Sequence, residues 1–223
     1  MVMIKAKVFY PTVFILTVLI LILSPMIDLP IAAYFYNAES GFYLKDCLIF
    51  KLLRKGFPET IGAIAGVITL LGIANYFFKK NILKISIKES LFLIISVVIG
   101  PGLIVNSILK NHSGRARPSQ IELFGGDKTF TPAYSFADEC LKNCSLASGH
   151  AAFAFWLTAL AMIAPIKYRK PLMLCFFSIG VLISFTRIVQ GGHFISDVFL
   201  GGLIAITCNF AVYRIIYHKN FEL

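Results

Sequence analysis

Charge is scarce in this chain, and negative charge is scarcer than positive. Only 14% of its 223 residues are charged, 58% are hydrophobic, and the mean hydropathy is +0.81. A typical soluble domain has about 25% charged residues, and here the apolar residues fall in long blocks. The composition excludes an ordinary soluble domain and indicates a single integral membrane domain over residues 1–223.

The few charged residues are mostly basic: 21 Lys and Arg against 11 Asp and Glu give a net charge of +10. A basic balance can signal nucleic-acid binding, but these cations are spread over short segments between apolar runs. Orientation in a bilayer requires that distribution. We therefore expect the bilayer as a partner and no nucleic acid.

Cysteine is also too sparse for a disulfide scaffold, with five in the chain. Cys175 and Cys208 lie inside apolar runs, where small core residues are expected, and Cys47 lies in a polar segment. Cys140 and Cys144 share a polar loop. They can form a bridge if that loop faces an oxidising compartment, and otherwise they are free thiols.

Six apolar runs predict an all-α polytopic membrane protein with six transmembrane helices. The first run lacks the small-x-small cleavage site of a signal peptide, so we expect it to remain as a helix. The runs cover about residues 8–24, 59–78, 89–109, 148–165, 171–187 and 193–216.

Three further segments carry a pattern. Residues 45–56 have basic residues on one arc and apolar residues on the other, which suits a helix in the membrane interface or a solvated face over protein core. Gly100-Pro101-Gly102 predicts a kink in the third helix. The polar loop 110–146 is too long for a simple connector and is expected to carry function.

Short basic connectors set the orientation. The N-terminus, residues 79–88, residues 167–170 and the C-terminal tail are basic with almost no acids, so the positive-inside rule places them in the cytoplasm. Six crossings then put both termini inside, and residues 28–57, 110–147 and 188–192 outside together. Polar groups from these outer segments are expected to converge.

The last polar stretch, between Arg187 and Asp197, puts ionisable groups at a membrane edge, where they are costly unless used. If a helix begins near Gly192, His193 and Asp197 stack on one face. Asp197 can then accept the proton of one imidazole nitrogen and leave the other bare as a nucleophile or base. A satisfied histidine at a polar helix end explains the stretch equally well.

Two earlier stretches offer anion-binding groups. Lys110 and Arg117 lack acid partners at the outer end of the third helix, where they could hold phosphate oxygens or serve as snorkelling anchors. Ser148-Gly149-His150 opens the fourth helix, where free backbone N–H groups attract anions, although Ser148 could be only an N-cap. Histidines and cations at one mouth indicate an anionic substrate.

Together the three stretches resemble the signature motifs of the type 2 phosphatidic acid phosphatase superfamily in order, spacing and topology. They are Lys110-x6-Arg117-Pro118, Ser148-Gly149-His150 and Arg187-x5-His193-x3-Asp197. Ala147 and Thr186 stand where that family usually has proline and serine, and neither change removes a reacting group.

The resemblance implies a metal-independent phosphatase with no cofactor and a phosphohistidine intermediate. His193 would attack phosphorus, Asp197 would fix its tautomer, and His150 would protonate the leaving oxygen and then activate water. The residues that would hold the phosphate oxygens are Lys110, Arg117, Arg187, Ser148 and Gly149. No cluster of metal-ligand character lies beside these residues in the sequence.

The long loop resembles the bacterial lipid A phosphatase branch in one set of features. These are Gly114-Arg115-Ala116-Arg117-Pro118, Phe124-Gly125-Gly126, Phe130-Thr131-Pro132 and Cys140-x3-Cys144-Ser145. The resemblance implies hydrolysis of a lipid phosphate, with lipid A as the expected substrate, at the outer face of a bacterial inner membrane. Undecaprenyl diphosphate or phosphatidylglycerol phosphate is the alternative.

Other polar residues of this loop have simpler expectations. His112 and Arg115 either contact a second phosphate or are solvated, and Asp127, Asp138 and Glu139 are expected at the surface. The rival class is a transporter or a catalytically silent lipid-binding protein. Charges at one mouth disfavour the first, and the intact histidine pair disfavours the second. Nothing in the sequence predicts an oligomeric state.

Overall fold

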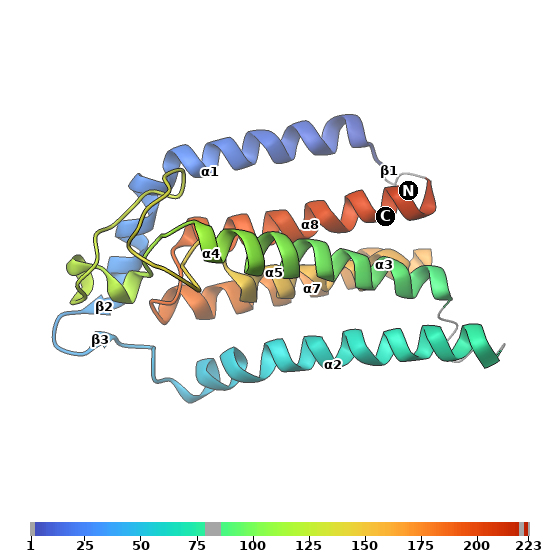
Figure 1. The fold of residues 1–223 in the computed structure, drawn as a ribbon, viewed down its shortest axis with the longest axis horizontal. Helices are drawn as coiled ribbons and strands as arrows, with labels where there is room; N and C mark the ends of the chain where they lie inside the picture. Colours follow the sequence, from blue (N-terminus) through green and yellow to red (C-terminus); the bar gives the residue numbers. More distant parts are fainter. Residues whose placement is uncertain (1–2, 79–85, 219–220, 223) are drawn as a thin grey trace.

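The fold is a bundle of helices that run side by side along one long axis (Figure 1). The computed structural model describes residues 3–78, 86–218 and 221–222. Strands are confined to two short pairs among these residues. The predicted all-α membrane class is confirmed.

Among the described residues, five helices are long and apolar enough to cross a membrane. They are α1 (Ala6–Tyr34), α2 (Leu48–Phe78), a continuous helix Ile87–His112, α7 (Ile166–Val189) and α8 (Ile195–Tyr217). Helix Ile87–His112 consists of α3 (Ile87–Val97), the π-helical η2 (Val98–Leu109) and α4 (Lys110–His112). The predicted fourth span is a shorter apolar stretch made of α5 (Gly149–Trp156) and α6 (Thr158–Ile163).

The two strand pairs mark the ends of the bundle. Strand β1 (Met3–Ile4) pairs with β4 (Phe221–Glu222), which brings both ends of the described chain together. Strand β2 (Tyr36–Asn37) pairs with β3 (Gly41–Phe42) at the other end. The loop that joins α4 to α5 lies at that second end (Figure 1), where it includes the single turns η3 (Pro118–Gln120) and η4 (Glu122–Phe124).

Two predicted boundaries are wrong. Helix α1 continues through Pro25 and Pro30 to Tyr34, ten residues beyond its predicted end. Prolines are tolerated in such helices because neighbouring groups can satisfy the freed carbonyls. Residues 48–56 are the first turns of α2, so the separate interfacial helix predicted over 45–56 does not form.

The Gly100-Pro101-Gly102 segment lies inside the π-helical stretch η2. Two polar side chains one turn later satisfy backbone carbonyls there: Asn106 Nδ2 donates to the Pro101 oxygen at 2.7 Å, and Ser107 Oγ donates to the Gly102 oxygen at 3.1 Å. Side chains thus add hydrogen bonds to two backbone carbonyls of the π-helical stretch. The predicted kink itself stays a prediction.

Helix α8 lies at the centre of the bundle and packs against α1, α5, α3 and η2. Glycine allows the closest of these contacts, because a Cβ at Gly201 would collide with the backbone of Ser148. Helix α2 contacts mainly α3 and leaves much of its surface exposed. The start of α8 and the start of α5 are therefore held together, with α2 as an outer cover.

Candidate active site

The turn between α7 and α8 presents His193. Gly191 adopts a left-handed conformation with φ of +64°, and a Cβ at Gly192 would collide with the Arg187 guanidinium. Helix α8 begins at Ile195, slightly later than predicted, and Asp197 Oδ2 accepts the Phe194 N–H at 2.9 Å. A carboxylate in the first helical turn satisfies a backbone donor that the helix leaves free.

The acceptor that orients His193 differs from the predicted one. His193 Nδ1 lies 2.8 Å from the Ser145 carbonyl oxygen and 3.8 Å from Asp197 Oδ2, which is too long for a hydrogen bond. A carbonyl can only accept, so Nδ1 carries the hydrogen. Nε2 then bears a lone pair, and it is buried without a partner among the described residues.

The imidazole of His193 is neutral in this setting. Its ring is 1% exposed. Burial lowers the pKa of His193 to about 3 against the opposing effect of Asp197, and Arg117 and Arg187 lower it further. A neutral imidazole with a bare, buried Nε2 has the form of a nucleophile.

Ser145 connects Asp197 to His193 by two hydrogen bonds. The Ser145 hydroxyl donates to Asp197 Oδ2 at 2.5 Å, while the Ser145 carbonyl accepts from the ring. The sequence named Ser145 only as part of the loop resemblance and gave it no role, because it lies 52 residues from Asp197 along the chain.

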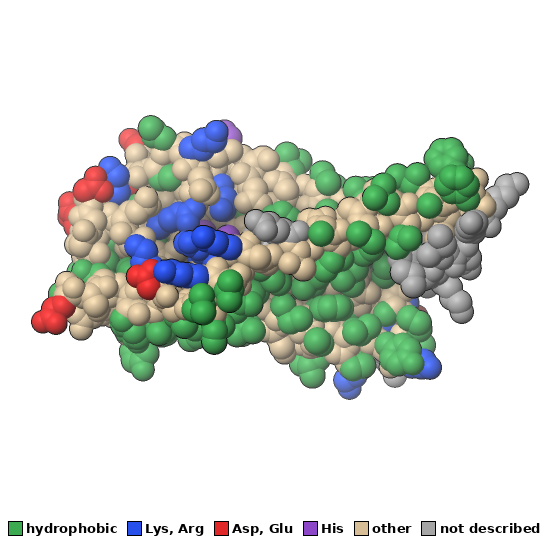
Figure 2. Space-filling model, turned by 90° about the horizontal axis from the view of Figure 1, so that it is seen from below, with side chains coloured by type: hydrophobic (Ala, Val, Ile, Leu, Met, Phe, Trp, Pro, Cys, Tyr) green, Lys and Arg blue, Asp and Glu red, His purple; other side chains and the backbone are tan. Residues whose placement is uncertain are grey.

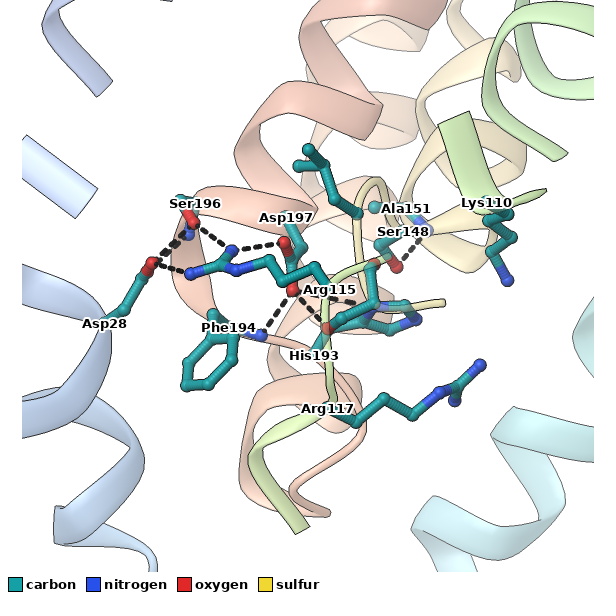
Figure 3. Close-up of polar contacts among 12 residues, drawn as sticks. Asp28, Lys110, Arg115, Arg117, Ser148, Ala151, His193, Phe194, Ser196 and Asp197 are labelled. Atoms are coloured by element: carbon teal, nitrogen blue, oxygen red, sulfur yellow. Dashed lines mark hydrogen bonds and ion pairs between the residues drawn. The ribbon is translucent and has the colours of Figure 1, made fainter. Parts of the chain in front are cut away.

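Arg115 lies behind Asp197 with its side chain fully buried. Its Nη1 donates to Asp197 Oδ1 at 2.6 Å and its Nη2 donates to Asp28 Oδ2 on α1, also at 2.6 Å (Figure 3). Burial opposes the charge, but the two carboxylates outweigh burial and raise the pKa of Arg115. Both predictions for Arg115, a phosphate contact or a solvated residue, are therefore wrong.

Three predicted phosphate-binding cations meet neutral partners. Lys110 Nζ donates to Asn143 Oδ1 at 3.1 Å, and Arg117 donates to the Asn143 carbonyl at 2.9 Å. Arg187 donates to Gln190 Oε1 at 2.5 Å. Burial lowers the pKa of Arg117, and the positive charge of Arg54 adds to that effect. Buried or half-buried cations that are held by amides rather than carboxylates remain available to an anion.

The cations and His193 share one region. Figure 3 shows the ends of Lys110 and Arg117 on the same side as the His193 ring, with Asp28 on the opposite side of Asp197. Figure 2 shows Lys and Arg gathered near one end of the visible face, with histidine between them, while much of the remaining face is hydrophobic.

The start of α5 forms the next wall of the site. Ser148 is its N-cap, as one prediction held: its side chain accepts from the Ala151 N–H at 3.4 Å. A Cβ at Gly149 would collide with the end of the Asn106 side chain, which would have to move. The Ser148 N–H donates to the Asp197 carbonyl at 3.0 Å, which joins this wall to α8.

His150 contacts a helix that the motifs do not include. Its Nε2 lies 3.0 Å from the backbone carbonyl of Arg54 on α2. The carbonyl accepts, so Nε2 carries the hydrogen. Arg54 belongs to the basic arc predicted over 45–56, and its contact with His150 could not be read from that pattern.

Residues 90–221 match the family described as the PAP2 superfamily. The chain belongs to the PAP2 superfamily. All three motifs lie within the matched residues, which confirms the resemblance drawn from them. Helices α1 and α2, which supply Asp28 and Arg54, precede the match.

Three relatives carry the name lipid A 4'-phosphatase. The one from Francisella tularensis subsp. novicida (strain U112) is 31% identical over 201 residues, 89% of this chain and 90% of its own length. The one from Rhizobium leguminosarum is 34% identical over 177 residues, 77% and 74% of the two chains. The third is from Rhizobium etli (strain ATCC 51251 / DSM 11541 / JCM 21823 / NBRC 15573 / CFN 42). It is 43% identical over 112 residues, which are 50% of this chain and 44% of its own length. No solved structure matches the chain.

The remaining residues named from the sequence of this PAP2 protein lie in the long loop and in helices α7 and α8. Cys140 and Cys144 form a disulfide, one of the two outcomes the sequence left open. His112, Asp127 and Asp138 are exposed, and half-buried Glu139 accepts the Thr129 N–H at 3.1 Å. Cys175 is exposed on the outside of the bundle, so its predicted core position is wrong, whereas Cys208 is buried.

Within the described ranges, no three His, Cys, Asp or Glu side chains gather as a metal ion would need. The cations near His193 are Lys110, Arg117 and Arg187, which the sequence predicted. Their partners Asn143 and Gln190 were not predicted.

Proposed function

We propose that this PAP2 protein removes a phosphate group from lipid A. The observation that carries the chemistry is the Nε2 of His193, which is buried and has no partner among the described residues. The nearby cations are held, within the same part of the chain, by neutral groups. The substrate is taken from the relatives' shared name, and their identity over most of two of the chains supports it. That name also points to the 4' position.

The proposed reaction has two steps. His193 Nε2 attacks phosphorus, the bond to the lipid oxygen breaks, and His150 donates a proton to that oxygen. His150 then takes a proton from water, which attacks the phosphohistidine and releases phosphate and free His193. Asp197 orients His193 through Ser145 and stabilises the positive ring.

The phosphate oxygens would be held by donors from three helices: Lys110, Arg117, Arg187, the Ser148 hydroxyl and the Gly149 N–H. Each such donor contributes about 2.7–4 kcal/mol to transition-state binding when it is preorganised. Cations in these positions do the electrostatic work of a metal ion, so we expect turnover without one.

We further propose a position in the membrane. The paired chain ends lie at the end of the bundle opposite to the site. With six crossings and the positive-inside rule, both termini are cytoplasmic and the site faces the periplasm or exterior of a bacterial inner membrane. The whole of residues 1–223 would act as one phosphatase domain.

The test is phosphate release in detergent, with chelator present, from diphosphorylated lipid A, undecaprenyl diphosphate and phosphatidylglycerol phosphate. We expect release from lipid A, with mass spectrometry locating the loss at the 4' position. His193→Ala should be inactive, while His218→Ala is the matched histidine control at the far end of the bundle. Release by His193→Ala at the wild-type rate would remove the nucleophile, and loss of wild-type release with chelator would remove the metal-free mechanism.

A further inference from the structure

Asp28 is a charged residue that no motif includes. It lies on α1, before the residues matched to the family, and its side chain is fully buried. Its Oδ2 accepts from Arg115 Nη2 at 2.6 Å and from Ser196 Oγ at 2.7 Å, and its Oδ1 accepts the Ser196 N–H at 3.0 Å. Burial of an unpaired charge is very costly, and these donors offset that cost for the Asp28 carboxylate.

The same guanidinium joins this carboxylate to the nucleophile. Arg115 donates to Asp28 and Asp197 from its two terminal nitrogens, and its charge lies 4.4 Å over the Phe194 ring. Asp197 in turn accepts from Ser145, whose carbonyl accepts from His193. Figure 3 shows the part of this series that runs from Asp28 through Arg115 to Asp197.

The charges along this line decide its effect. Asp28, Arg115 and Asp197 together carry two negative charges and one positive charge, so the buried group is net negative. When His193 bonds to phosphorus its ring becomes positive, and a net negative neighbour stabilises it. Without the Asp28 charge, Arg115 would neutralise Asp197 completely and that stabilisation would be lost.

We propose that Asp28 and Arg115 are positioning residues for the phosphoryl transfer: Asp28 shares the Arg115 charge and thereby keeps Asp197 effective as the partner of His193. This rests on the proposed function of the site. It assigns to α1, which lies outside the three motifs, a direct part in the rate of the chemical step.

The first comparison is between two variants of α1. Asp28→Asn removes the charge but keeps the shape. Ser24→Ala is the matched control, because the buried Ser24 Oγ accepts the Ala133 N–H at 3.0 Å and so also ties α1 to the loop, without reaching Asp197. With diphosphorylated lipid A in detergent, we expect Asp28→Asn to lower kcat about 10- to 100-fold with KM within about threefold, and Ser24→Ala to lie within about threefold in both.

The second comparison removes both charges of the pair. The double variant Asp28→Asn/Arg115→Gln leaves Asp197 as the sole charge of the group, so the net charge equals that of the wild type. We expect its kcat to exceed that of Asp28→Asn and to lie within about tenfold of wild type. A residue that only stabilises the fold would shift the thermal unfolding midpoint, but kcat of the folded variants would not follow the net charge of the buried group.

The inference is overturned if kcat of Asp28→Asn stays within threefold of wild type, if Ser24→Ala loses as much, or if the double variant is slower than Asp28→Asn. If Asp28→Asn does not fold, the double variant decides: a kcat below a tenth of wild type overturns the proposal. Wild-type protein that releases no phosphate from any of the lipids would instead contradict the proposed function.

Discussion

The two histidines of the site have different surroundings. His193 is 1% exposed, and its neighbours connect it to the long loop, to α8 and to α1. His150 is partly exposed and meets the backbone of α2, the helix that packs less closely on the bundle. His193, the proposed nucleophile, lies against a buried charged group, whereas His150, the proposed acid, is covered by the surface of α2.

This difference suits the two parts of the reaction. The attacked phosphorus must always lie in line with Nε2, so a rigid imidazole lowers the entropic cost of attack. The leaving oxygen belongs to a lipid, which needs room beside His150. We therefore expect substitutions around His193 to lower stability and the rate of the chemical step. Substitutions on α2 should mainly weaken substrate binding.

The largest expected effect separates the two histidines by leaving group. His150→Ala should slow hydrolysis of the lipid by about 10²–10⁴-fold, the usual contribution of a general acid. The first step, release of the leaving group, should slow much less with an aryl phosphate such as p-nitrophenyl phosphate, because that leaving group needs no proton. Pre-steady-state release of p-nitrophenol and of the lipid alcohol tests this, because the second step, attack of water, is common to both substrates. Equal losses in the first step with the two substrates would contradict the assignment of His150 as the acid, whereas His193→Ala should lose both.

The next effect tests the buried charge behind His193. Arg115→Met leaves two buried carboxylates without their cation, and breaking such a pair costs about 3–5 kcal/mol. We expect a marked fall in the thermal unfolding midpoint in detergent. Arg54→Met is the matched control on the α2 side and should stay within about 0.5 kcal/mol, as exposed substitutions do. Similar thermal midpoints for Arg115→Met and Arg54→Met would show that the buried charge behind His193 contributes no more to stability than the exposed charge on α2.

A smaller effect concerns the pH dependence of stability. The pKa of His193 is lowered from 6.5 to about 3 on folding, so the unfolded chain binds the proton more readily between those values. The neutral ring therefore contributes its full stability above about pH 6.5 and loses it as the pH falls towards 3. Thermal midpoints of wild type should fall more steeply over this range than those of His193→Asn. Parallel curves would argue against a neutral, buried His193.

The smallest effect concerns Arg54 on α2, the helix that covers His150. Arg54→Ala keeps the backbone carbonyl that contacts His150 but removes a cation near Arg117. We expect KM to rise about three- to tenfold with little change in kcat, and the difference to shrink in high salt as screening increases. Lys7→Ala, which removes an exposed charge near the start of α1, is the control for net charge. A salt-independent effect on kcat would move Arg54 into the chemical step.

Much of the site could be predicted because its reactive groups lie in short local motifs. Glycine and serine at a helix start predict an anion-binding end of the helix. A histidine four residues before an aspartate predicts two neighbouring side chains on one helix face. The predicted contact between His193 and Asp197 was nevertheless wrong in detail, because a loop carbonyl competes for Nδ1. The roles assigned to these residues stay predictions until the variants are measured.

The sequence by itself determined the membrane class, the helical content and the list of candidate reacting groups, since these follow from apolar run length and from side-chain chemistry. Only the tertiary structure decided which groups support them. Arg115 reaches Asp197 and Asp28 across 82 and 87 residues, and Ser145 reaches His193 across 48. Buried charges select partners by three-dimensional distance in a low-dielectric interior, and spacing along the chain does not encode that distance.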